Sequence, residues 1–220
     1  MTWRTAPPDI YTDGTTLPRT LTIGPPREVA KEYDEELHPR NAQGEWTSGG
    51  GETRSISSAA RQTLASVERT LKGKEVEHVA VVNPATGQVL VRNTTGESYS
   101  CSIPRSELSK VNGAVVTHNH PLERGLSMAD ISLAMTHNAL AVRAVTPSGT
   151  VYELRRIGAW PKRLLVQYDQ DTSGVMENLF QRVARGELTN NDADAAVSHE
   201  VLARTAQAFP NQVRYTRSHP

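Results

Sequence analysis

The chain has 220 residues, which is room for one ordinary domain with extensions or for two small domains. Lys+Arg and Asp+Glu both total 24, and this zero formal net charge argues against a protein that coats nucleic acid. No apolar run approaches the ~18 residues that span a bilayer, and the first residues lack the apolar core of a signal peptide. A single cysteine, Cys101, excludes an internal disulfide framework. We therefore expect a soluble protein of a reducing compartment, the cytoplasm, with no nucleic-acid or membrane partner.

Residues 1–55 are predicted to form a mostly disordered extension or linker. They are rich in proline and end in a Ser-Gly-Gly-Gly run at 48–51. Their aliphatic residues are sparse and without period, so the segment cannot bury enough surface to offset its ordering entropy. One short helix is predicted at 26–37, with proline at its start.

Residues 57–158 have the pattern of a mixed α/β domain. A helix is predicted to begin at Ser57 or Ser58, with one apolar face. Strands are expected at 76–82, 88–92, 98–103 and 114–117, and a helical turn or short helix at 104–111. A second helix runs from Ser127 to about 138, and a hairpin joins 140–145 to 151–157. This order of elements indicates an α+β arrangement, with a sheet flanked by helices.

Residues 159–220 are predicted to form a helical C-terminal extension. One amphipathic stretch begins near Leu164, and a second helix is expected over 192–209, where Pro210 ends it. These helices carry too little apolar surface for a core of their own. We expect them to pack on the preceding domain or to mediate assembly.

The segment from Thr117 to Asp130 carries the candidate chemistry. Residues two apart on a strand point the same way, so His118 and His120 present two imidazoles on one face. Imidazole is the commonest metal ligand in proteins. Asp130, in the first turn of the next helix, can add a carboxylate oxygen. Two histidines and one aspartate leave a tetrahedral zinc with an open position, as in catalytic sites.

Each half of this pattern also has an ordinary structural explanation. A His-x-His string occurs by chance, and Ser127-x-x-Asp130 alone is a capping box that begins a helix. The combination on adjoining elements is harder to obtain by chance. The two explanations of Asp130 are compatible, because one carboxylate oxygen can bind a metal while the helix N-terminus favours the negative charge.

The string His118-Asn119-His120-Pro121, followed by Ser127-x-x-Asp130, resembles the JAB/JAMM (MPN+) metalloprotease superfamily. The resemblance covers roughly residues 75–157 and includes the 144–152 segment, which is similar to a hairpin of bacterial and phage members. It implies a curved mixed β-sheet with flanking helices. It also implies one Zn2+ and hydrolysis of peptide or isopeptide bonds, often at the C-terminus of ubiquitin-like proteins.

The resemblance implies a role for each matching residue. His118, His120 and Asp130 would bind zinc, and Ser127 would hydrogen-bond the reaction intermediate. A glutamate on an early strand would be the general base. Glu77 is the preferred candidate because it lies nearer the buried run, and Glu75, on the same face of the same strand, is the alternative.

One spacing departs from the family pattern. The loop between Pro121 and Ser127 is one residue shorter than usual, which leaves the zinc ligands nearly unaffected but puts the aim of Ser127 in doubt. Residues 38–50 are similar to linkers in phage portal and head-morphogenesis proteins. If the protein is phage-encoded, its substrate would be a phage structural protein rather than a ubiquitin-like protein, and the protein would be associated with the virion.

Two other functional classes are compatible with the sequence. The first is a non-catalytic interaction or assembly module that keeps the scaffold. The second is a metal-dependent nuclease or toxin, suggested by the adjacent letters HNH at 118–120. Nuclease motifs of that name distribute the three residues over a ββα unit, and the zero net charge also counts against this class.

Overall fold

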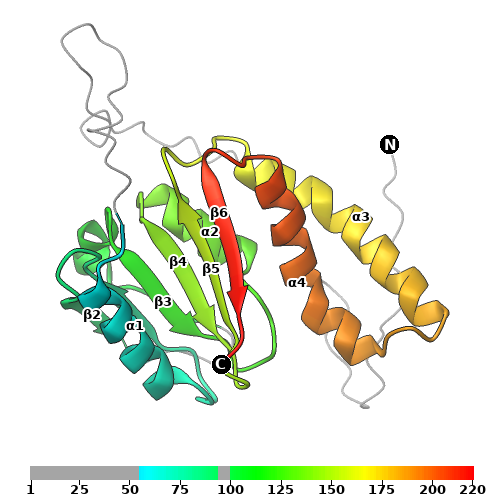
Figure 1. Cartoon of the computed structure of the whole chain (residues 1–220), viewed down its shortest axis with the longest axis horizontal. Coiled ribbons are helices and arrows are strands. Elements are labelled where there is room, and N and C mark those ends of the chain that lie inside the picture. The colour runs from blue at the N-terminus through cyan, green and yellow to red at the C-terminus, as the bar shows by residue number, and fades with distance from the viewer. Residues whose placement is uncertain (1–54, 94–99) are drawn as a thin grey trace, which may run out of the picture. The chain divides into compact units, whose positions relative to one another are not determined.

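The structure is a computed structural model that describes residues 55–93 and 100–220 (Figure 1). The predicted extension at 1–55, except its last residue, lies outside the described residues. So do its helix at 26–37 and the phage-like string at 38–50.

The described residues form a mixed α/β fold built on one six-stranded sheet of order β2-β1-β3-β4-β5-β6 (Figure 1). Strands β3 and β4 are parallel, and the other neighbours are antiparallel. The strands are β1 (Val79–Val82), β2 (Val89–Asn93), β3 (Val115–Asn119), β4 (Ala141–Val145), β5 (Val151–Arg156) and β6 (Val213–Ser218). The helices are α1 (Ser58–Leu71), η2 (Arg105–Val111), α2 (Met128–Thr136), α3 (Leu164–Ala184) and α4 (Asn190–Gln207). None of these helices is long and apolar enough to cross a membrane.

Helices cover both faces of the sheet. Alternate residues of the central strands point to opposite sides and are apolar on both, so each face needs a covering layer. Helix α1 packs on one face through the apolar stripe that its sequence predicts: Ala60, Leu64, Val67 and Leu71. Helices α2, α3 and α4 contribute to the larger core on the other face, where Val116 and Val142 of the central strands lie. The candidate metal ligands of β3 point to this second face.

A buried charged network ties α1 to the sheet on the first face. Arg143 of β4 donates to the Glu68 carboxylate through Nε (2.6 Å) and Nη2 (3.1 Å) and also pairs with Glu153 of β5. Thr117 of β3 donates to the same Glu68 carboxylate at 3.0 Å. One arginine therefore connects one helix and two strands.

Most predicted elements are confirmed with small shifts of their ends. Ser57 caps α1, accepting a hydrogen bond from the Ala60 N–H, and Ser127 caps α2 in the same way through the Asp130 N–H. The predicted strand at 76–82 begins only at Val79, whereas the strand predicted at 114–117 continues to Asn119. The hairpin at β4 and β5 and both C-terminal helices are present.

Two predictions are wrong. In the third strand predicted at 98–103, residues 98 and 99 lie outside the described residues, Ser100 forms an isolated bridge, and residues 101–103 form no strand. The C-terminal extension is not helical to its end, because β6 pairs with β5 and forms an edge of the sheet. The alternation of Val213 and Tyr215 with polar residues is the strand signal that the helical interpretation missed.

Candidate metal centre

His118 and His120 occupy the end of β3 and face the α2 side of the sheet. His118 is buried and lies within the pairing of β3 with β1 and β4, opposite Val79 and Ala144. His120 lies one residue past the strand, and its N–H donates to the Val145 carbonyl oxygen at 3.0 Å. The sheet therefore fixes the backbone that carries both imidazoles.

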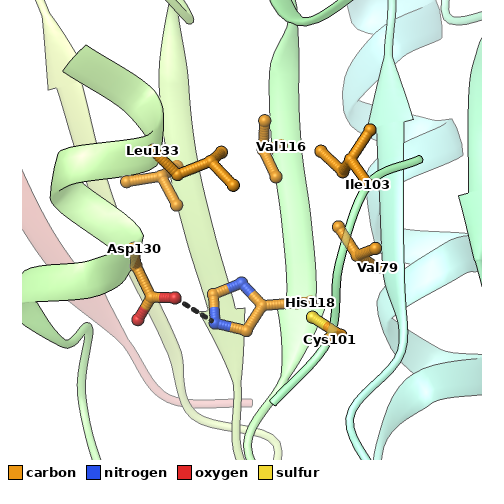
Figure 2. Close-up of a pocket in the computed structure, with 8 residues that line it drawn as sticks. Val79, Cys101, Ile103, Val116, His118, Asp130 and Leu133 are labelled. Atoms are coloured by element: carbon orange, nitrogen blue, oxygen red, sulfur yellow. Dashed lines mark ion pairs between the residues drawn. The ribbon is translucent and has the colours of Figure 1, made fainter. Parts of the chain in front are cut away.

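Asp130 faces His118 from the first turn of α2 (Figure 2), and its carboxylate also lies near His120. Its Oδ2 accepts hydrogen bonds from the N–H and the Oγ–H of Ser127, both at 2.7 Å. Its Oδ1 lies 3.2 Å from His118 Nε2. One oxygen closes the capping box while the other faces His118, so the two explanations of Asp130 are compatible.

The three side chains have the spacing of ligands around one metal ion. Their ligand atoms all lie within 4.8 Å of one another. His118 Nε2 is 2.8 Å from His120 Nε2, and His120 Nε2 is 3.5 Å from Asp130 Oδ2. Two donors that each lie ~2.0–2.1 Å from a tetrahedral zinc are about 3.3–3.4 Å apart. The group can therefore hold a metal ion with only small movements of the side chains.

The hydrogen bond on the far side of His120 favours metal binding. His120 Nδ1 lies 3.0 Å from the Arg124 carbonyl oxygen, which can only accept. Nδ1 therefore carries the proton, and in the neutral ring Nε2 keeps its lone pair toward His118 and Asp130. A backbone carbonyl in this position is the usual outer partner of a metal-binding histidine.

The two candidate bases, Glu77 and Glu75, lie in different environments in the structure. Glu77 is half-buried and interacts electrostatically with His118, His120 and Asp130, whereas Glu75 is exposed. Glu77 precedes β1 by two residues and so lies on the same side as Val79, the register partner of His118. Of the two carboxylates, Glu77 is the one that the fold brings to the metal ligands.

Asn119, between the two histidines, has its side chain on the opposite side of β3 and is fully buried. Its Oδ1 accepts from the His78 N–H at 2.8 Å, and its Nδ2 donates to the carbonyl oxygens of Val76 (3.0 Å) and Lys74 (3.3 Å). These bonds hold the segment that carries Glu77 against the strand that carries the ligands. Strand alternation could have placed Asn119 on this face, but nothing in the sequence indicated its partners.

Ser127 lies where the motif predicts, at the N-cap of α2. Its hydroxyl donates to Asp130 Oδ2 and accepts from the Asp130 N–H at 3.2 Å. The expected part of Ser127 in binding a reaction intermediate stays a prediction. In the structure, Ser127 orients Asp130.

The charges at the centre perturb one another. Burial alone would raise the pKa of Asp130, but the charges and hydrogen bonds of His118 and His120 hold that pKa well below its usual range. Burial alone would lower the pKa of His120, yet the hydrogen bond and charge of Asp130 raise it above its ordinary value. Burial also raises the pKa of Glu77, and the two imidazoles offset only part of that effect.

An apolar pocket opens beside His118 and Asp130 (Figure 2). Its cavity volume is about 30 Å³, room for little more than a water molecule, and its other lining residues are Val79, Cys101, Ile103, Val116, Leu133 and Val142. Burial raises the pKa of the Cys101 thiol to about 12, and the nearby Glu77 carboxylate adds to this effect. The thiol is therefore protonated at neutral pH, and no pattern in the sequence indicates that it lies beside the candidate centre.

Comparison of the chain with protein-family models, curated proteins and solved structures found no match. The assignment of a candidate metal centre therefore rests on the geometry of His118, His120 and Asp130 alone.

The pH dependence of stability should reverse when metal binds. In the metal-free protein the raised pKa of His120 contributes stability that is present below the unfolded value of ~6.5 and is lost as pH rises through the folded pKa. Metal requires neutral imidazoles, so the stability that it adds should grow as pH rises. Urea unfolding between pH 5.5 and 8, with zinc and with a chelator, checks this; parallel pH profiles in both conditions would contradict it.

Proposed function

We propose that this chain is a zinc-dependent hydrolase of the JAB/JAMM type that cleaves a peptide or isopeptide bond. The observation that carries the proposal is the convergence of His118, His120 and Asp130 with Glu77 beside them. Three protein ligands leave a fourth position of a tetrahedral metal open, which is the arrangement of catalytic rather than structural zinc sites. A mixed sheet flanked by helices is also compatible with the family resemblance of the motif.

A bound zinc ion would lower the pKa of a water molecule and polarise the scissile carbonyl group. Glu77 is the proton carrier in this proposal: it accepts the proton of the attacking water and passes it to the leaving amine. Its half-buried carboxylate is held near the ligands by the bonds of Asn119 to the 74–78 segment. Ser127 orients Asp130 through its backbone N–H, and its hydroxyl is proposed to turn from Asp130 Oδ2 and donate to the developing oxyanion.

The substrate classes that we propose are a ubiquitin-like protein or, if the protein is phage-encoded, a phage structural protein. Both would present an extended peptide or a lysine-linked amide rather than a nucleotide.

The test is metal-dependent release of an amine. Zinc-loaded protein should cleave a panel of lysine-linked isopeptides and linear peptides, and the chelator-treated protein and His118→Ala should not. Bound zinc with no cleavage of any amide would favour the non-catalytic assembly module instead. Cleavage of DNA or RNA, with no release of amine, would favour the nuclease.

A further inference from the structure

We infer that helix α4, near the C-terminal end of the chain, positions the metal centre through Ser198 and Asp194. These residues hold the loop at 122–126 so that one of its carbonyl groups can orient His120. The inference rests on the metal centre of the proposed function, but it does not depend on which bond the protein cleaves.

The central feature is a single peptide group, the one that joins Arg124 to Gly125. Its carbonyl oxygen lies 3.0 Å from His120 Nδ1, and its N–H donates to Ser198 Oγ at 2.8 Å. A peptide group is planar and rigid, and in the trans form its C=O and N–H point in opposite directions. Ser198 therefore fixes the orientation of the group that orients the His120 ring, and rotation of this peptide would break both bonds.

The arginine that supplies this carbonyl is also held by α4. The Arg124 guanidinium pairs with Asp194 Oδ2, at 3.1 Å from Nε and with a shorter contact from Nη2. Asp194 and Ser198 are four residues apart and so lie on one face of the helix. The same helix face therefore contacts the loop at two consecutive residues.

Gly125 permits this close approach. A Cβ atom at this position would lie 3.2 Å from Ser198 Oγ and 3.4 Å from both the His199 nitrogen and Tyr152 Cδ1. The loop residue is buried between α4 and β5, and a side chain would push the loop away from the helix. The helix itself is anchored by Val201 and Leu202, which are fully buried in the main core.

The consequence is that Asp194 and Ser198 contribute to metal affinity through the loop at 122–126 rather than as ligands. Outer partners of metal-binding histidines fix the ring orientation and tautomer, and their loss weakens metal binding by ~10–100-fold. Here the outer partner is a backbone carbonyl, which no substitution at Arg124 removes. The orientation of this carbonyl can be changed instead by substituting Ser198, whose hydroxyl accepts from the N–H of the same peptide group.

The experiment measures zinc affinity of the full chain by competition with a chromophoric chelator. We expect Ser198→Ala to bind zinc ~10–100-fold more weakly than the wild type, and Ser198→Thr, which keeps a hydroxyl group, to restore most of the affinity. The matched control is Ser173→Ala, at an exposed position of α3, which should bind like the wild type. Gly125→Ala should weaken binding through the displaced loop.

Urea unfolding of the metal-free variants separates positioning from general stability. Positioning predicts that Ser198→Ala loses affinity even where its free energy of unfolding matches that of the control. Wild-type affinity in Ser198→Ala would overturn the inference and leave the proposed hydrolase intact. Zinc binding without amide cleavage by the wild type would overturn the hydrolase and leave this inference standing.

Discussion

Replacing Glu77 by glutamine should lower the rate of amide hydrolysis by ~10²–10⁴, while zinc content and fold stay unchanged. Glutamine keeps the size and hydrogen-bonding capacity of the side chain but cannot accept a proton. Because Glu77 lies beside the proposed ligands without being one of them, the substitution separates catalysis from metal binding. Steady-state rates on an isopeptide substrate, with zinc measured in the same samples, provide the readout.

Glu75→Gln is the matched control for this experiment. Glu75 is the same residue type two positions away and is exposed, so its replacement should leave the rate near that of the wild type. An inactive Glu75→Gln beside an active Glu77→Gln would move the base to Glu75. Full activity in both variants would remove the general base from this segment.

Replacing Arg143 by leucine should lower the free energy of unfolding by about 3–5 kcal/mol, because it leaves buried carboxylates without their cation. Glu68 accepts two hydrogen bonds from Arg143, and its side chain is only 7% exposed. Glu153 loses the same partner. The Arg143 side chain is itself only 18% exposed, so little water can replace the guanidinium between α1 and the sheet. Urea unfolding monitored by circular dichroism measures the effect.

The control for Arg143 is another arginine in an ion pair, at the surface. Arg185 pairs with Glu187 beyond the end of α3, and both are exposed. Fully exposed pairs contribute little to stability, so Arg185→Leu should leave the free energy of unfolding near that of the wild type. If Arg143→Leu lowered the free energy of unfolding as little as Arg185→Leu does, the charged network on the α1 face would be screened by solvent.

Much of the fold could be predicted because its central elements have unambiguous local patterns. The stripe from Ala60 to Leu71 has helical period, and the capping serines at 57 and 127 mark where α1 and α2 begin. The Pro147-Ser148-Gly149 turn separates two β-rich runs, which pair as a hairpin. In these segments the local preference and the tertiary structure agree.

The elements that could not be predicted depend on distant partners. Strand β6 is an edge strand with a weak alternating pattern, and only β5 gives it a place to pair. The 98–103 segment contains aromatic and β-branched residues, yet among its described residues only Ser100 forms a bridge. Tertiary context overrides local propensity in both cases.

The candidate site also has residues that could be predicted from the sequence and contacts that could not. The candidate ligands His118, His120 and Asp130 could be predicted because strand alternation and a helix cap place them within the sequence motif itself. Periodicity puts Glu77 and Glu75 on one strand face, and the sequence favours Glu77 only by its nearness to the buried run. The fold adds that the Glu77 carboxylate lies near the candidate ligands. The contacts of Ser198 with the Arg124–Gly125 peptide span more than 70 residues, and no local pattern encodes such a contact.

The most direct test of the metal centre is anomalous diffraction from a crystal of the zinc-loaded protein, measured on both sides of the zinc absorption edge. We predict one strong anomalous peak, ~2.0–2.2 Å from His118 Nε2, His120 Nε2 and a carboxylate oxygen of Asp130. A peak held by other residues, or none between these three side chains, would contradict the account.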